Sequence, residues 1–412
     1  MRNNKAIRST ETVDLGAVIS INPDSVGKDF RFETIKYIDI TSVGSGTLNG
    51  FSEIKFSKAP SRAKRLVRSA DTILSTVRPN RRSFLYVKNP KPNIVVSTGF
   101  AVLRATDKID SRYLYYTVTH QPFTDYLTNN AKGAAYPAVD TETIARAEIW
   151  LPPLPTQRKI AAILSAYDDL IENNLRRIRI LEEMAQLIYR EWFVNFRFPG
   201  HEKVRMVESD LGKIPEGWQT KNLFAVAEVT YGFPFQSKLF TQEPAGMAVI
   251  RIRDIASNET KTFTTETARE KYLVENGDIL VGMDGDFRMT KWAGGKAYLN
   301  QRVVRFRPEG GVASYYLFLA LQKPIAYFNS TTVGTTVAHL SDEDLRSIYL
   351  LVPDEDTARK SWPIFGSVFS LEIALRLQIA NLRRTRDLLL PKLISGELDV
   401  SELDIDIGEE PA

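Results

Sequence analysis

Residues 156–196 read TQRKIAAILSAYDDLIENNLRRIRILEEMAQLIYREWFVNF, a segment without proline or glycine. Because those two residue types end or weaken helices, the segment predicts one long helix. Ten positions recur at alternating steps of four and three residues, and nine of them are apolar: Ile160, Leu164, Tyr167, Ile171, Asn174, Ile178, Leu181, Ala185, Ile188 and Trp192. This spacing is typical of the seam of a coiled coil, so we expect a partner helix.

The predicted helix is too long for the core of one small domain. At a rise of about 1.5 Å per residue it would extend roughly 60 Å, which favours a helix that connects two bodies. The only polar residue of the seam is Asn174. A buried asparagine can fix the register of paired helices, and a solvated end of the seam would equally allow one.

The second half of the chain repeats the first. DTILSTVRPN corresponds to GDILVGMDGD, and SRYLYYTVTHQP corresponds to ASYYLFLALQKP. Four identical pairs share one offset of 201 residues: Gly133 and Gly334, Pro152 and Pro353, Thr156 and Thr357, and Arg158 and Arg359. A common offset predicts a tandem duplication. The second copy also ends in a predicted helix, whose seam positions are Ile364, Val368, Leu371, Leu375, Gln378, Leu382, Thr385 and Leu389.

Short β-like runs such as FETIKYIDI and NIVVSTGFAVL accompany one helical run in each copy, which predicts an α+β fold. We expect four segments: a mixed domain over 1–155, a long helix over 156–200, a second mixed domain over 201–355, and a helix with an acidic tail over 356–412. Two copies of a domain and a helix imply a pseudo-dimer. Its simplest closed form is two-fold, with antiparallel helices as a coiled coil and a domain at each end.

Composition excludes several classes of protein. The chain has no cysteine and only three scattered histidines, His120, His201 and His339, so we expect no metal site and no disulfide. The N-terminus lacks the apolar core of a signal peptide, and the most apolar run is interrupted by Lys323 and Pro324. These features predict a cytoplasmic protein without a membrane span. The net charge of +4 permits nucleic acid as a ligand but does not require it.

No motif for catalysis is present. The glycine-rich run VGSGTLNG at 43–50 precedes no helical pattern, so a hairpin turn explains it better than a nucleotide loop. The sequence HEKVR resembles a zinc-protease motif but places Arg205 where the second histidine would stand. Paired acids such as Asp168 and Asp169 belong to the predicted helix, where a solvated face explains them. We therefore expect no active site and no cofactor.

Basic residues are concentrated in the first copy. Residues 55–91 carry eleven lysines and arginines against one acid, Asp71, which predicts a phosphate-binding surface. The candidate DNA contacts there are Arg62, Lys64, Arg65, Arg78, Arg81 and Arg82. The small-residue loop KGAAYPA adds Lys132 and Tyr136, because such a loop permits close approach to a ligand. A simple turn explains this loop equally well.

The second copy interleaves basic residues with aromatics and amides. Arginine can bond a guanine edge in two places and glutamine an adenine edge, so these residues are candidate base readers. They are Gln236, Arg251, Arg253, Arg288, Lys291 and Trp292, with Thr335 and Thr336 from the corresponding loop VGTTVAH. For each of them, a phosphate contact or an idle surface position is the simpler interpretation.

The order of these motifs resembles the specificity subunit of type I restriction-modification systems. The resemblance covers nearly the whole chain and rests on LPPLPTQRKIAAIL, NGDILVGMDGD, the loops KGAAYPA and VGTTVAH, IPEGW, and LLLPKLISGEL. Two features depart from the family pattern. The first copy lacks a PxGW opening, and the second helix opens SWPIFGSV where the first reads KIAAILSA. These departures affect the expected helix boundaries.

The resemblance implies two target recognition domains, each reading one half of a bipartite target in double-stranded DNA. It also implies that the two helices set the spacing and bind modification subunits, of which we expect two. Those subunits would bind S-adenosylmethionine and methylate adenine, and restriction subunits would supply ATP-driven translocation and cleavage. The chain itself would be a non-catalytic recognition subunit.

Two other classes of function remain open from the residues. A DNA methyltransferase with its own cofactor site would need an [ND]PP[YF]-type element, but Leu151 precedes the only Pro-Pro pair. A coiled-coil scaffold without a nucleic acid function would need only the two seams. Binding of S-adenosylmethionine without a partner would favour the first, and failure to bind DNA with partners present would favour the second.

Overall fold

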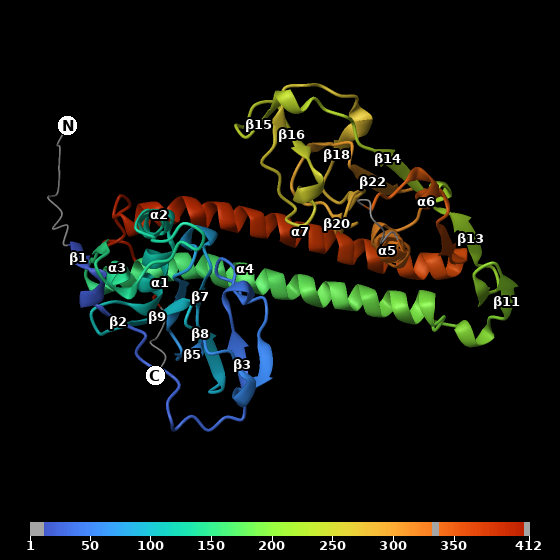
Figure 1. The fold of residues 1–412 in the computed structure, drawn as a ribbon. Helices are drawn as coiled ribbons and strands as arrows, with labels where there is room; N and C mark the ends of the chain where they lie inside the picture. The colour runs from blue at the N-terminus through green and yellow to red at the C-terminus, as the bar shows by residue number, and fades with distance from the viewer. Residues whose placement is uncertain (1–11, 332–337, 408–412) are drawn as a thin grey trace. The chain divides into compact units, whose positions relative to one another are not determined.

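The computed structural model describes residues 12–331 and 338–407, which belong to two compact units (Figure 1). Unit 1 consists of Met1–Leu170 with Leu382–Ala412, and unit 2 is the continuous segment Ile171–Asn381. Each unit contains one mixed domain and a part of both long helices. The predicted fold class, two tandem mixed domains with two long helices, is therefore confirmed, whereas the four segment boundaries stay a prediction.

The two long helices are α4 (Leu154–Tyr189) and α7 (Glu355–Ile394). A five-residue π-helical turn, Arg190–Val194, extends α4. The predicted helix over 156–196 is therefore confirmed as far as Val194 and ends two residues before Phe196. Such turns are rare and insert one extra residue into the helical repeat. In α7 the residue Pro391 lies within the last turn and does not end the helix before it.

Within each unit the two helices are antiparallel and contact each other (Figure 1). In unit 1, Arg386 donates to Asp168, and the cluster around Leu164 on α4 includes Leu393 on α7. In unit 2, Asn174 Nδ2 donates to Gln378 Oε1 at 3.1 Å. Asn174 is 3% exposed. It is therefore a buried polar residue of the seam and not a solvated end of it.

Most of the predicted seam residues are buried or half-buried, among them Ile160, Leu164, Tyr167, Ile171, Asn174, Ile178, Leu181, Ile188, Leu375, Leu382 and Leu389. The predicted seam residues Gln378 and Thr385 of α7 are exposed. In the first half of α7 the seam differs by one residue from the expected pattern. The expected positions Ile364 and Leu371 are 37% and 41% exposed, and the buried positions are instead Phe365, Val368, Glu372, Leu375 and Ile379. The sequence pattern missed this difference because one of the buried positions is a charged residue, Glu372, which a search for apolar residues passes over.

Unit 1 contains two four-stranded sheets, ordered β2-β9-β6-β7 and β4-β3-β8-β5, and the pair β1-β10. The pairing is antiparallel except between β3 and β8. The strands and helices are β1 (Thr12–Asp14), β2 (Ile19–Ile21), β3 (Thr34–Ile38), β4 (Ser52–Lys55), β5 (Ala63–Leu66), β6 (Thr72–Ser75), β7 (Phe84–Tyr86), β8 (Ile94–Ser97), β9 (Phe100–Ala105), α1 (Ser111–Thr119), α2 (Gln121–Asn129), α3 (Thr141–Ala145) and β10 (Glu148–Trp150).

Unit 2 contains the sheets β14-β22-β19-β20 and β15-β17-β16-β21-β18, with the pairs β13-β23 and β11-β12. The strands and helices are β11 (Met206–Ser209), β12 (Gly212–Pro215), β13 (Gln219–Asn222), β14 (Ala227–Tyr231), β15 (Phe240–Thr241), β16 (Met247–Ile250), β17 (Phe263–Thr264), β18 (Leu273–Val274), β19 (Ile279–Gly282), β20 (Met289–Lys291), β21 (Ala297–Leu299), β22 (Val303–Pro308), α5 (Ser314–Thr331), α6 (Asp342–Arg346) and β23 (Tyr349–Val352).

The two units share one topology. The sheet β2-β9-β6-β7 corresponds strand by strand to β14-β22-β19-β20, and the pair β1-β10 corresponds to β13-β23. The parallel pair β3-β8 has its counterpart in β16-β21. This agreement supports the duplication that the common offset predicts.

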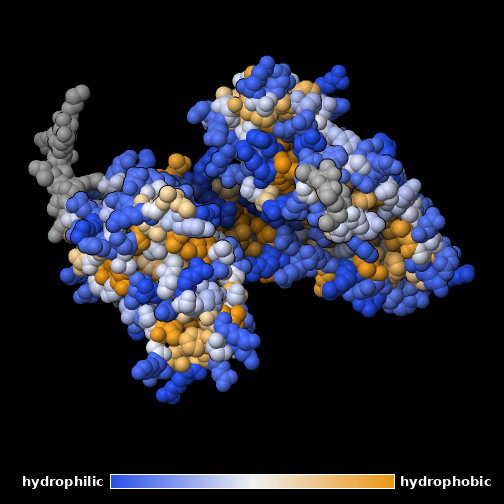
Figure 2. Space-filling model, viewed as in Figure 1, coloured by the Kyte–Doolittle hydropathy of each residue, from blue (hydrophilic) through white to orange (hydrophobic). Residues whose placement is uncertain are grey.

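Each core includes residues of the long helices. In unit 1, Ile160 of α4 and Leu393 of α7 are fully buried with Leu15 and Leu114. In unit 2, Phe365 of α7 is fully buried with residues of α5 and β22. By length and composition alone α7 could cross a membrane, but its buried apolar residues belong to these cores. Figure 2 shows a largely hydrophilic surface on the face it presents, with apolar patches between the polar residues.

Candidate nucleic-acid interface

In unit 1 the loop after β6 is bound to the loop between α2 and α3. The backbone N–H of Arg78 donates to the carbonyl of Pro137 at 2.7 Å, and that of Val139 donates to Thr76 at 2.9 Å. Val77 and Ala138 form an isolated antiparallel bridge. We call these two segments, 76–82 and 132–138, the loop pair of unit 1. The basic run and the small-residue loop of the sequence are thus brought together.

Arg78 and Tyr136 lie in contact within this loop pair. The guanidinium carbon of Arg78 is 4.7 Å from the centre of the Tyr136 ring, and its Nη2 donates to the carbonyl of Ala135 at 3.1 Å. Tyr136 is 71% exposed. An arginine stacked on an exposed aromatic ring offers both donors and a flat apolar surface, which suits contact with nucleotide bases.

Unit 2 has a corresponding loop pair after β19. The backbone N–H of Gly285 donates to Ala338 at 2.8 Å, and that of Leu340 donates to Met283 at 2.8 Å. Asp284 and His339 form the bridge that matches the one in unit 1. We call 283–288 with 338–340 the loop pair of unit 2. Thr335 and Thr336 lie outside the described residues.

The two loop pairs differ in charge. In unit 2, Asp284 accepts from His339 Nδ1 at 2.7 Å and is 3.2 Å from the guanidinium of Arg302. Asp286 pairs with Arg288 at 2.7 Å. In unit 1, Val77 and Pro79 occupy the positions of these two acids. The loop pair of unit 1 is therefore cationic, whereas that of unit 2 offers carboxylates beside its cations.

A buried ion pair supports the strand that leads to each loop pair. Arg104 Nε and Nη2 donate to both oxygens of Asp71 at 2.8 Å, and Arg307 donates to both oxygens of Asp278 at 2.6 and 2.8 Å. These hydrogen bonds raise the pKa of Arg104 and of Arg307. Because the fork geometry fixes two bonds at once, each strand is held in one position.

The remaining candidates of unit 1 divide into two groups. Arg62 and Lys64 are exposed at the start of β5, on the sheet that does not carry the loop pair, and Arg65 is half-buried there. Arg81 and Lys132 are exposed in the loop pair, where Lys132 lies 3.6 Å from Asp140.

Arg82 contacts the interior of unit 1. Its Nη2 donates to the carbonyl of Thr119 at 2.8 Å, and its Nη1 donates to the side chain of Gln121. The guanidinium thereby holds the loop to the α1–α2 junction. A phosphate contact would have to replace these bonds.

The candidates of unit 2 outside the loop pair lie near β15 and β16. Gln236 is exposed, and Arg253 is exposed beside Asp254 at 3.7 Å. Arg251 is half-buried, with its guanidinium 5.7 Å from the centre of the Phe240 ring. These three residues lie in the segments next to the strands of the second sheet and are not part of the loop pair, which includes Arg288.

The prediction is wrong for Lys291 and Trp292, which are 4% and 0% exposed. Trp292 packs in a core cluster, and its Nε1 donates to the carbonyl of Gly295 at 2.6 Å. Neither side chain can reach a base edge while the domain is folded. Their position three and four residues after Arg288 made them resemble surface readers, but both side chains point into unit 2.

Lys291 instead belongs to a buried cluster that joins β20 to both long helices. Its Nζ donates to Glu372 at 2.8 Å and to the Tyr315 hydroxyl at 3.0 Å. Arg376 donates to Glu372 and to Glu182, both at 2.8 Å. Burial lowers the pKa of Lys291; burial also acts to raise the pKa of Glu372, but the neighbouring cations hold it below its usual value. The cluster fixes the second domain to its helices.

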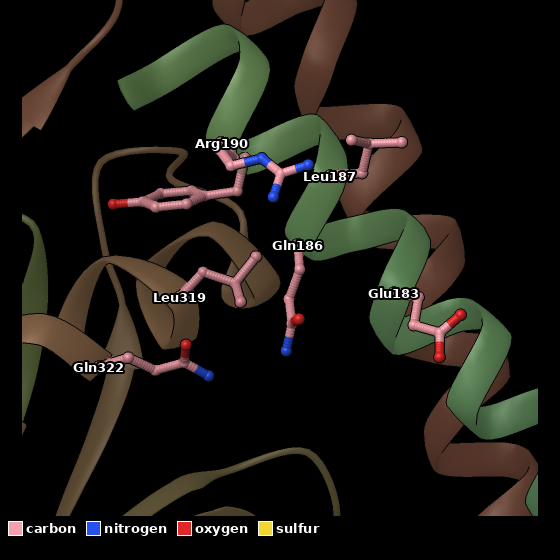
Figure 3. Close-up of a pocket in the computed structure, with 7 residues that line it drawn as sticks. Glu183, Gln186, Leu187, Arg190, Leu319 and Gln322 are labelled. Carbon is pink, nitrogen blue, oxygen red and sulfur yellow. The ribbon is translucent and has the colours of Figure 1, made fainter. Parts of the chain in front are cut away.

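A pocket of about 570 Å³ lies in unit 2 between α4 and α5 (Figure 3). It is lined by Glu183, Gln186, Leu187, Tyr189, Arg190, Leu319 and Gln322. Figure 3 shows the side chains of Gln186, Leu319 and Gln322 directed toward the space between the two helices. Amides mixed with apolar groups suit contact with another surface better than acid–base chemistry.

Comparison with known proteins identifies the family. The sequence profile of the type I restriction modification DNA specificity domain matches residues 9–183 and 215–382. The chain belongs to this family. The two matches cover the two copies found in the sequence, so the predicted resemblance is confirmed.

Relatives of known class agree with this assignment. The specificity subunit of the type I restriction enzyme MjaIX from Methanocaldococcus jannaschii is 29% identical over 81% of this chain and 78% of its own length. That of HindI from Haemophilus influenzae is 22% identical over 89% and 96%. The solved S subunit of a type I restriction-modification system from M. genitalium shares the fold, with a TM-score of 0.57, 16% identity, and coverage of 96% and 98%. A specificity subunit is therefore favoured over a methyltransferase with its own cofactor site and over a coiled-coil scaffold.

Proposed function

We propose that the loop pairs of the two units are the DNA-reading surfaces of a type I specificity subunit, each directed to one half of a bipartite target. The observation that carries this proposal is the repeat of one construction: in both units the same backbone bonds join two loops at the end of a strand held by a buried ion pair. Loops on a rigid scaffold are the usual place for recognition residues. The target is double-stranded DNA, which locates the protein in the cytoplasm.

The set of proposed DNA contacts follows from the positions of the side chains. Loop-pair residues would contact base edges, and exposed cations elsewhere would contact phosphates. We assign Arg78, Arg81, Lys132, Tyr136 and Arg288 to the first group, together with Asp284 and Asp286 from the structure. Arg62, Lys64, Arg65, Gln236, Arg251 and Arg253 form the second group, and Arg82 supports the loop.

The modification subunits would bind along α4. Ile180, Met184 and Leu187 are 47–50% exposed and recur at helical spacing on the face away from the seam. Val194 in the following π-helical turn is 54% exposed. This stripe, next to the pocket with Gln186, suits an apolar helix of a partner. Two modification subunits would supply S-adenosylmethionine binding and adenine methylation, and restriction subunits would add ATP-driven translocation and cleavage. This chain would contribute recognition and no catalytic group.

The test is to reconstitute the complex with its modification subunits and map methylated adenines across a genome. We expect a split motif with a fixed gap. Joint replacement of Arg81 and Tyr136 by alanine should change the base preference in one half only. Changes in both halves, or DNA methylation without any split motif, would contradict the proposal.

Docking has its own test. Leu187→Glu should reduce recovery of the modification subunit with the tagged chain, because it places a charge in the apolar stripe. Leu211→Glu is the matched control, since Leu211 is 53% exposed in the β11–β12 turn. Equal recovery with both variants would show that partners bind elsewhere.

A further inference from the structure

The backbone of Arg78 adopts a conformation that arginine disfavours. Its φ and ψ are 50° and 60°, in the left-handed region where the Cβ atom of any L-residue is crowded. In unit 2 the equivalent residue is Gly285, with φ of 71°. Glycine adopts this conformation without strain. Unit 1 therefore carries an arginine at a position where the shared fold favours glycine, which indicates that the side chain itself is needed.

The side chain of Arg78 is held in place before any ligand arrives. One edge of the guanidinium donates to Ala135, and one face lies against Tyr136. No carboxylate pairs with Arg78 among residues 12–331 and 338–407. The remaining N–H groups thus keep their capacity to donate, in a plane that the ring and the carbonyl fix.

We propose that Arg78 reads a guanine in the half-site bound by unit 1. Guanine presents two adjacent acceptors, O6 and N7, in the major groove, and a planar guanidinium donates to both. A phosphate contact would need charge but no fixed plane, so the stacked and bonded arrangement favours a base edge. The inference rests on the proposed function and assigns a base to one residue of the loop pair.

Unit 2 reads a different base at the corresponding place. Gly285 has no side chain, and the neighbouring Asp284 and Asp286 carry carboxylates instead of donors. A base would have to replace their present bonds to His339, Arg302 and Arg288. A carboxylate accepts from the exocyclic amino group of cytosine. The two half-sites should therefore differ at the positions that face residues 78 and 285.

The test uses the reconstituted complex and a DNA library with randomised half-sites, sequenced after methylation. The variant Arg78→Gly removes the side chain and also the strain of the left-handed backbone conformation. We expect the preference for guanine to fall about 5- to 150-fold at one position of one half-site, with the other half unchanged. We also expect the melting temperature to stay within about 2 °C, because relief of strain offsets the lost contacts.

The variant Arg78→Lys separates a base contact from a phosphate contact. Lysine keeps the charge but not the planar pair of donors, so guanine preference should fall while the salt dependence of binding is kept. Retention of the motif by Arg78→Lys would overturn the proposal. Ala70→Gly, at another left-handed position with φ of 70°, is the control for backbone relief. Arg146→Ala, which removes an exposed cation directly after α3, is the control for charge.

The outcomes also distinguish this inference from the proposed function. If the unmodified complex yields no split motif, the proposed function fails. If it yields a split motif that Arg78→Gly leaves unchanged, or if the lost preference is for a base pair other than G·C, only the role of Arg78 fails. A large drop in melting temperature in Arg78→Gly would show that the side chain serves the fold.

Discussion

Single residues of the loop pair in unit 1 have separate tasks despite their similar chemistry. Arg81 is exposed and makes no ion pair among the described residues, whereas Arg82 donates to Thr119 and Gln121. Both arginines sit in one basic run of the sequence. Only the exposed one is free to release counterions from DNA when it binds a phosphate or a base.

We therefore expect different effects from two alanine variants. Arg81→Ala should lower affinity and reduce the slope of log affinity against log salt by about 0.9, the value for one lost contact. Arg82→Ala should leave the slope unchanged and lower the melting temperature, because it removes two internal hydrogen bonds. Titrations of the reconstituted complex at several salt concentrations measure the slope. Equal slopes for the two variants would contradict this division.

Asp24 gives a prediction about pH. Arg104 donates to it at 2.8 Å and Arg68 lies 3.0 Å from it; these contacts, the Arg104 hydrogen bond foremost, lower the pKa of Asp24 below its usual value of 3.8. A lowered pKa in the folded state stabilises the protein above pH 3.8, and this contribution is lost as the pH falls through the folded value.

The variant Asp24→Asn should reduce the free energy of unfolding at pH 7 by about 1 kcal/mol or less, because solvent screens the partly exposed pair. The difference from the unmodified protein should shrink as the pH falls below 3.8. Urea unfolding at a series of pH values measures it. A difference that grows toward acid pH would show that Asp24 is not stabilised as a carboxylate.

Among elements, β20 is joined to both long helices by charge. Lys291, Glu372 and Arg376 come from β20 and α7, and Glu182 comes from α4. Removal of one member of a buried ion pair leaves an uncompensated charge, whereas removal of both can be nearly neutral. The cluster therefore makes the free energy of unfolding sensitive to single changes.

We expect Lys291→Met to lower the free energy of unfolding of unit 2 by about 3 kcal/mol. The double variant with Glu372→Leu should lose less, because Arg376 keeps Glu182 as a partner. Thermal and urea unfolding of the full chain measure both. If the double variant is less stable than the single one, Glu372 stabilises the protein through contacts other than the one with Lys291.

The sequence could predict the elements better than the charges inside them. The four-and-three spacing of apolar residues indicated both long helices, and the common offset indicated the repeat. The buried position of Glu372 was missed because an apolar pattern excludes a carboxylate, and its partner Lys291 lies 81 residues away in sequence. The residues around Arg78 do not indicate that its backbone is left-handed. The alignment of the two copies pairs Arg78 with Asp284, and only the backbone bonds of the loops identify Gly285 as its equivalent.

For the whole molecule, the length of the helices should set the gap between half-sites. Insertion of one heptad in each long helix, at 173–177 of α4 and beside the facing Gln378 of α7, adds about 10 Å of helix. This length corresponds to about three base pairs at roughly 3.4 Å each. The second domain must also turn about 100° around the duplex, given about 10.5 base pairs per turn. Bending the DNA would cost about 1 to 6 kcal/mol, so weaker binding should accompany the shift.

Methylation mapping of the insertion variant decides this point. A longer gap with both half-site sequences intact is the expected result. A deletion of one heptad is the matched variant and should shorten the gap by the same amount. An altered half-site sequence in either variant would mean that the helix itself contacts bases.

Unit 1 is built from two distant parts of the chain, and this has a consequence for synthesis on the ribosome. Leu393, Ile394 and Val400 complete a core that begins with Leu15, whereas unit 2 is one continuous segment. During translation the core of the first domain can be completed only after more than half of the polypeptide has been synthesised behind it. Unit 2 can reach its final structure first, although its residues emerge later than those of the first domain.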